Sequence, residues 1–141
     1  MNDRAMGQQP VVLYVEDDAH SRRLMSMLLK GRMKLSQVTM LEDTQNFLSV
    51  VNAIEPKPTV ILLDIHVKPL NGFEMLTLLR AQDWCADVPI VALTASVMKE
   101  EIRQPEAAGF NGCLAKPIEL DTFPAAMEQI LAGQPVWHVF N

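Results

Sequence analysis

Three short runs of apolar residues constrain the fold of this 141-residue chain more than any other feature of its sequence. They cover residues 11–15, 60–63 and 89–93, are rich in β-branched side chains, and show no alternation of polar with apolar positions. Runs of this kind are typical of strands that are buried on both faces of a parallel sheet. We therefore expect them to form the centre of such a sheet.

Helical patterns separate these runs along the chain. Phe47, Val50, Val51 and Ile54 repeat at helical spacing, and similar patterns cover residues 22–30, 73–79 and 120–130. A fourth helix, at residues 97–108, contains Pro105 and is expected to be short, kinked or mobile there. With two weaker strands near residues 34–40 and 112–115, five alternating units predict an α/β fold. It is a doubly wound, five-stranded parallel sheet with helices on both faces.

Composition narrows the range of partners and locations. The net charge of -5 disfavours nonspecific nucleic-acid binding, which requires Lys and Arg to replace phosphate counterions. No apolar run is long enough to span a membrane, and the polar N-terminus has no secretory signal pattern. Cys85 and Cys113 form neither a disulfide framework nor a metal-binding spacing, which favours a reduced, cytoplasmic protein. We expect an N-terminal extension at residues 1–9, one domain at 10–131 and a tail at 132–141.

Polar residues follow four of the predicted strands. In an open α/β sheet, ligands bind beyond the carboxyl ends of the strands. Each residue alone has an ordinary explanation, such as a helix cap at Asp18, but their coincidence predicts a site for phosphoryl transfer onto Asp64. There Mg²⁺ and Lys116 would offset charge, and Thr94 would donate a hydroxyl hydrogen bond. The residues at the four strand ends are Glu16, Asp17 and Asp18, then Asp64, Thr94 and Lys116.

The sequence resembles the receiver domain of two-component response regulators over residues 10–131. The matching segments are residues 12–18, 61–65, 71–74, 92–95, 108–109 and 115–117. The intervals from Asp64 to Thr94 and to Lys116 also agree with that family. Singly these motifs are weak, but their order and spacing are specific. The resemblance implies a flavodoxin-like sheet with the strand order 2-1-3-4-5.

The resemblance also implies roles for individual residues. Asp64 would accept a phosphoryl group from a phosphohistidine of a histidine kinase or phosphotransfer protein, with Lys116 pairing to that group. Mg²⁺ would be bound by Asp17 and Asp64 directly, by Glu16 through water, and by the backbone carbonyl of His66. Thr94 would move inward and change the face formed by the fourth helix, fifth strand and fifth helix, which would signal to a downstream protein. Such a domain catalyses its own phosphorylation and dephosphorylation and is not a metabolic enzyme.

Three positions depart from the family pattern. Cys113 stands where the family usually has an aromatic residue that couples to Thr94, so we expect Thr94 to move without an aromatic switch. Lys68 occupies the position of the usual loop proline, which here comes next as Pro69. Pro105 interrupts the fourth helix.

The sequence also bears on three alternative functions. A phosphate-independent pseudo-receiver that binds proteins stays open as the alternative, because Cys113 alters the switch position. A haloacid dehalogenase-type phosphohydrolase is disfavoured, because it needs a second Asp where this chain has His66. A dinucleotide-binding enzyme is disfavoured, because no Gly-x-Gly-x-x-Gly pattern follows the first predicted strand.

The segment after Leu131 is too short for an output domain. We therefore expect signalling through another protein, or a chain that is part of a longer one. Its apolar residues either pack back on the domain or form an interaction or homodimer patch. They are Val136, Trp137, Val139 and Phe140.

Overall fold

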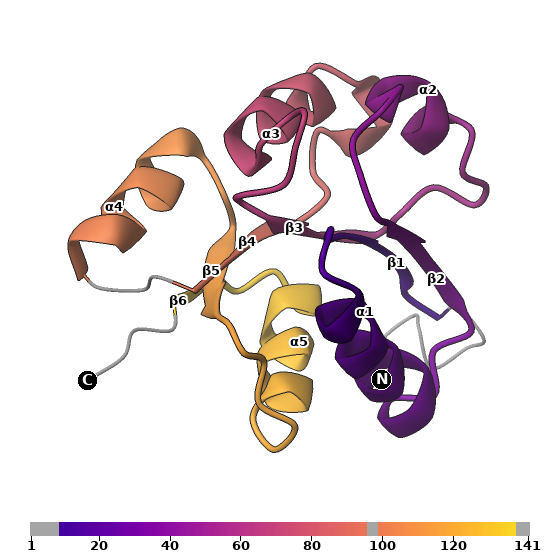
Figure 1. Cartoon of the computed structure of the whole chain (residues 1–141), viewed down its shortest axis with the longest axis vertical. Helices are drawn as coiled ribbons and strands as arrows, with labels where there is room; N and C mark the ends of the chain where they lie inside the picture. The colour runs from indigo at the N-terminus through magenta and orange to yellow at the C-terminus, as the bar shows by residue number, and fades with distance from the viewer. Residues whose placement is uncertain (1–8, 96–98, 138–141) are drawn as a thin grey trace.

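The computed structural model describes residues 9–95 and 99–137 and shows a parallel sheet with the order β2-β1-β3-β4-β5-β6 (Figure 1). The predicted α/β class and the order of the first five strands are confirmed. The expected number of strands was too low by one, because part of the tail pairs with β5. The strands are β1 (Val11–Val15), β2 (Gln37–Leu41), β3 (Val60–Asp64), β4 (Ile90–Thr94), β5 (Gly112–Ala115) and β6 (Val136–Trp137).

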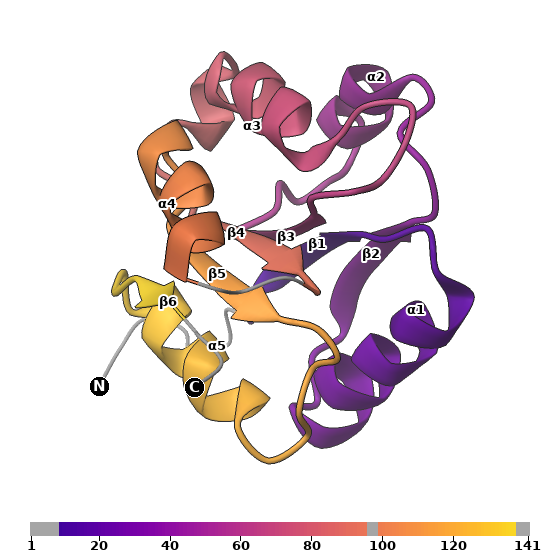
Figure 2. The same ribbon diagram turned by 60° about the vertical axis from the view of Figure 1, so that its left-hand side comes forward.

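Helices cover both faces of the sheet. Helices α1 and α5 lie on one face, and α2, α3 and α4 lie on the other (Figures 1 and 2). A π-helical segment, Met27–Arg32, continues α1, and a 3₁₀ helix, Asp83–Cys85, follows α3. The α-helices are α1 (Ala19–Ser26), α2 (Phe47–Asn52), α3 (Gly72–Arg80), α4 (Lys99–Ala108) and α5 (Phe123–Leu131).

Two apolar layers, one on each face of the sheet, form the core. Every residue of β1, β3 and β4 is buried, which explains why their sequences show no polar alternation. The strand β2 lies at the edge of the sheet and is only partly buried. The buried central strands therefore fix where their carboxyl ends lie.

The helix boundaries follow local sequence signals. The predicted cap at Asp18 is confirmed, because its Oδ2 accepts the Ser21 amide at 2.8 Å. Pro124 lies in the first turn of α5, where its missing N–H costs little. Helix α4 does not end at Pro105 but continues to Ala108, although the predicted kink or mobility there stays a prediction.

The tail turns back onto the domain directly after α5. Gly133 has a positive φ of 86°, and the Gln134 amide donates to the Gln129 carbonyl at 2.9 Å, which closes the helix end. Val136 then pairs with Gly112, and Trp137 pairs with Cys113. This confirms for Val136 and Trp137 that the tail packs on its own domain. Val139, Phe140 and residues 1–8 of the N-terminal extension lie outside the described residues.

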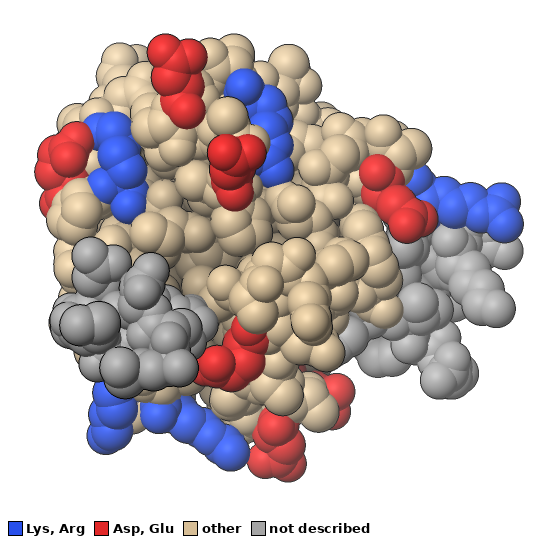
Figure 3. All heavy atoms as spheres, turned by 180° about the vertical axis from the view of Figure 1, so that it is seen from behind, with Lys and Arg blue, Asp and Glu red and all other residues tan. Residues whose placement is uncertain are grey.

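Charges are dispersed over the face shown in Figure 3, where basic and acidic side chains lie interspersed around a broad uncharged area. Within the part of the chain that the structure describes, every helix is too short or too polar to cross a bilayer.

Candidate functional site

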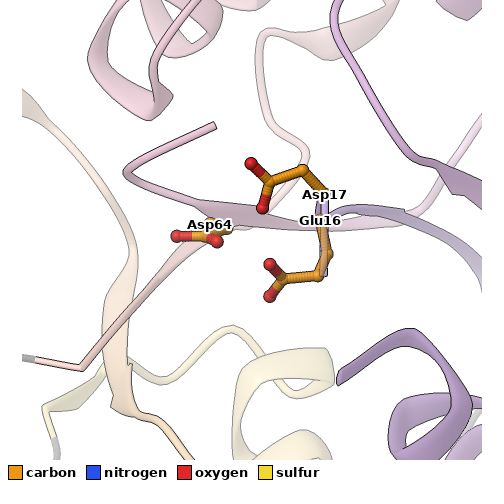
Figure 4. A group of neighbouring side chains, drawn as sticks. All are labelled: Glu16, Asp17 and Asp64. Carbon is orange, nitrogen blue, oxygen red and sulfur yellow. The ribbon is translucent and has the colours of Figure 1, made fainter. Parts of the chain in front are cut away.

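The carboxyl ends of β1 and β3 bring three carboxylates together. One oxygen from each of Glu16, Asp17 and Asp64 lies within 4.8 Å of the others. Figure 4 shows Glu16 and Asp17 extending to opposite sides of the sheet from the end of β1, with Asp64 at the end of the neighbouring strand. Glu16 and Asp64 are buried, whereas Asp17 is exposed. Hard oxygen donors in this number suit Mg²⁺, which retains several of its waters.

Lys116 joins this cluster from the end of β5. Its Nζ donates to Oε1 of Glu16 at 2.7 Å and to Oδ2 of Asp64 at 3.1 Å. One ammonium therefore faces two buried carboxylates, and the third carboxylate, Asp17, lies beside them. The site carries a surplus of negative charge that a cation would neutralise.

Glu16 has further partners that the sequence analysis missed. The Tyr14 hydroxyl donates to its Oε1 at 3.0 Å, and the Asp18 amide donates to its Oε2 at 3.3 Å. The Arg22 guanidinium donates to its backbone carbonyl at 2.8 Å. Tyr14 could have been found, because it is the one polar side chain of a buried strand and shares a face with Glu16 two residues later.

The charges of the cluster depend on one another. Burial, together with the neighbouring Asp64 carboxyl, raises the pKa of Glu16 to about 7. Burial also acts to raise the pKa of Asp64, but bonding to Glu16, the His66 amide and Lys116 brings it below its usual value. Burial acts to lower the pKa of Lys116, and its two carboxylate partners outweigh that effect and raise it. Asp64 is thus held in its nucleophilic, ionised form.

The β3–α3 loop fixes the orientation of Asp64. The His66 amide donates to its Oδ1 at 3.0 Å, while the His66 side chain is exposed. Gly72 is required where the loop returns, because a Cβ there would lie 2.9 Å from Cα of Ile65. Asn71 and Glu74 then form a capping box at the start of α3. The His66 carbonyl as a metal ligand stays a prediction.

Thr94 and Cys113, the two predicted switch positions, both lie buried on neighbouring strands. Thr94 pairs with Ala115, and its carbonyl accepts the Lys116 backbone amide at 2.9 Å, so the backbones of Thr94 and Lys116 are joined. Burial raises the pKa of the Cys113 thiol to about 11, which leaves it neutral and unreactive near pH 7. The structure thus brings together all the predicted acceptor, ammonium and metal-binding side chains.

A comparison with known families matches residues 12–128 to the response regulator receiver domain. The chain belongs to this family. It is a receiver domain homologous to those of phosphorylatable response regulators in two-component systems.

Individual relatives agree with this assignment. The chain is 31% identical over 125 residues to a nitrate/nitrite response regulator protein homolog of Haemophilus influenzae, covering 89% of this chain and 58% of that protein. A solved bacteriophytochrome response regulator is 31% identical, with a TM-score of 0.72 over 86% of this chain and 77% of that one. A chemotaxis response regulator of Vibrio cholerae, 24% identical, supports the fold alone, with a TM-score of 0.76 over 86% of this chain and 98% of that one. The chain spans 58% and 12% of the first two curated relatives.

Proposed function

We propose that Asp64 accepts a phosphoryl group from a phosphohistidine on a histidine kinase or a histidine phosphotransfer protein. The observation that carries this proposal is the ionised, buried Asp64 carboxylate, held 3.1 Å from the Lys116 ammonium among further carboxylates at one sheet edge. An Asp64 oxygen attacks phosphorus, the phosphorus–nitrogen bond breaks, and the bonding electron pair returns to the imidazole nitrogen, which takes up a proton. The product is an aspartyl phosphate.

The residues around Asp64 have different roles in this step. The Lys116 ammonium already contacts Asp64, so it can pair with the negative charge of the phosphoryl oxygens once the group is on Asp64. Thr94 donates its hydroxyl to a phosphoryl oxygen after a short inward movement. The Tyr14 hydroxyl and the Asp18 amide keep Glu16 in place while Lys116 shifts toward the new group.

The carboxylate cluster fits a magnesium ion held by Asp17, Asp64 and the His66 carbonyl, which would supply positive charge to the phosphoryl oxygens. The exposure of Asp17 supports direct binding by this residue. The engagement of Glu16 with Tyr14 and Lys116 supports a contact through water.

The phosphorylated domain signals to a downstream protein. A cytoplasmic location is part of this proposal and is supported by the two free cysteines, Cys85 and Cys113. We do not propose the phosphate-independent binding module, because Asp64, Lys116 and the acidic pair are all present and correctly assembled.

Incubation with acetyl phosphate and Mg²⁺ tests the proposal. We expect intact mass spectrometry to show one added phosphoryl group that survives acid and is released by base. Chelation of Mg²⁺ with EDTA should strongly reduce the uptake. An unchanged mass, or a group that resists base, would refute phosphorylation of a carboxylate.

A further inference from the structure

The short strand β6 is shaped to lie on the edge of β5. The left-handed Gly133 turns the chain after α5, and Val136 then pairs with Gly112. A Cβ at Gly112 would lie 2.6 Å from the Val136 carbonyl oxygen, and its three closest neighbours are all backbone atoms of Val136. The close approach of the two strands therefore depends on glycine at this position.

The docked strand contacts both layers of the core. Val136 is buried in the layer beneath α5, whereas the partly buried Trp137 packs against the layer that contains Cys113 and Phe110. Within the described part of the tail, which ends at Trp137, two residues pair with β5. Their apolar burial is opposed by the backbone freedom that the tail loses, and these two terms are of similar size. Such a strand can be displaced without unfolding the domain.

Two adjacent rows of side chains connect Trp137 with Thr94 on the same face of the sheet. One row runs from Ala92 through Cys113 to Trp137, and the next contains Thr94 and Ala115. The side chains between Trp137 and Thr94 are the small ones of Cys113 and Ala115, and they lie in or against the same core layer as Trp137. Because protein interiors are closely packed, movement of Thr94 toward Asp64 would remove contacts from this end of the rows.

We propose that β6 is a displaceable strap whose docking on β5 opposes the inward movement of Thr94, so that phosphorylation of Asp64 releases it. This inference rests on the proposed function. Release would expose the backbone groups of β5, which is an edge able to pair with another strand. Linkage requires the converse as well: releasing the strap should strengthen binding at the phosphorylation site by the same factor.

Fluorescence of Trp137 reports the position of the strap. In a Trp84→Phe background, Trp137 is the remaining tryptophan. We expect beryllofluoride with Mg²⁺, a phosphoryl mimic, to shift its emission to the red and to increase quenching by acrylamide. An Asp64→Asn variant in the same background should show neither change.

Gly112→Ala tests the link in the opposite direction. The added methyl should displace β6, giving red-shifted Trp137 emission without beryllofluoride and binding beryllofluoride at least about fivefold more tightly. Gly31→Ala is the matched control, because a Cβ at Gly31 meets nothing within 4 Å. Its emission and affinity should equal those of the parent. Val136→Ser, which removes the buried anchor of the strap, should reproduce the effects of Gly112→Ala if the latter folds poorly.

The outcomes separate this inference from the proposed function. Phosphoryl uptake with unchanged Trp137 emission would overturn the strap while leaving the function intact. Unaltered beryllofluoride affinity in folded Gly112→Ala and Val136→Ser variants would overturn it as well. Absence of phosphoryl uptake by mass would refute the function and the link together.

Discussion

The two ends of the sheet use polar groups in different ways. At the carboxyl end, Lys116 contacts both Glu16 and Asp64, and these charged groups are largely withdrawn from water. At the amino end, the Asn111 Oδ1 accepts the Ile90 amide at 2.8 Å and Arg80 Nη2 at 2.6 Å. One end concentrates interacting charges, while the other uses a neutral acceptor to join a loop to a strand.

This difference shows which polar networks are structural and which are chemical. Arg80 also donates to the carbonyls of Cys85 and Val88, both at 2.8 Å, so its donors serve the backbone. The carboxylates at the opposite end raise or lower one another's pKa, and Asp17 beside them stays exposed. Groups that perturb one another next to solvent are typical of a reactive site.

The largest effect should come from replacing an aspartate at one end and then at the other. Asp64→Asn retains the shape of the side chain but removes the nucleophilic oxyanion, so phosphoryl uptake should be abolished. Asp87→Asn, an exposed position before β4 at the amino end, should take up one phosphoryl group as the parent does. Intact mass after acetyl phosphate treatment measures both, and full uptake by Asp64→Asn would show that the acceptor is another residue.

A smaller effect should separate the carboxylates within the carboxyl end. Asp17→Ala should weaken Mg²⁺ binding at least about tenfold, equivalent to about 1.4 kcal/mol, because an exposed direct ligand is lost. Glu16→Gln should weaken it less, because Glu16 already bonds Lys116 and Tyr14. Isothermal titration with Mg²⁺ gives the two affinities. Equal binding by Asp17→Ala and the parent would remove Asp17 from the metal site.

At the amino end, we expect substitutions to lower the stability of the domain without lowering its phosphoryl uptake. Asn111→Ala should lower the free energy of unfolding by about 1–3 kcal/mol, because the Ile90 amide loses its acceptor. Asn111→Asp, which retains an acceptor oxygen, is the matched control and should lose less. Urea denaturation measures the stability, and phosphoryl uptake by the folded variants should stay at the parental level. A loss of uptake in folded Asn111→Ala would contradict the division between the two ends.

The last effect is a gradual dependence of stability on pH that originates at Glu16. Its pKa rises from 4.5 to about 7 on folding, so between these values the folded chain holds a proton that the unfolded chain has lost. The contribution of Glu16 to the free energy of unfolding therefore falls as pH rises through this window, by at most about 1.4 kcal/mol per unit. Urea midpoints measured without Mg²⁺ should show this slope, and Glu16→Gln should flatten it. An equal slope in both proteins would assign it to other groups.

The sequence predicted most of the sheet and the membership of the site. Short, continuous apolar runs rich in β-branched residues are typical of buried strands, and the carboxyl ends of parallel strands meet at one edge, so Asp64, Thr94 and Lys116 were predicted to lie together. The hydrogen bonds within the cluster could not be predicted from the sequence, because Tyr14 and Arg22 reach Glu16 only in the folded geometry.

The strand β6 was missed for a different reason. Two residues give no periodicity, and their pairing depends on a turn at Gly133 and on close approach at Gly112. The helix predicted at residues 97–108 shows the converse, since α4 covers Lys99–Ala108 with Pro105 inside it, as the local pattern indicated. Local signals thus failed at β6, where tertiary contacts decide the outcome.

The assembly of the site from distant segments has a consequence for the order of folding. Lys116 and Glu16 are 100 residues apart in the sequence, so their contact closes one of the longest loops in the chain. A chain that has paired only β1, β2 and β3 holds Glu16, Asp17 and Asp64 without the ammonium that offsets their charge. Contacts at such separations form late and slowly. Competence to accept a phosphoryl group should therefore arise only when β5 has joined the sheet, and incompletely folded chains would send no signal.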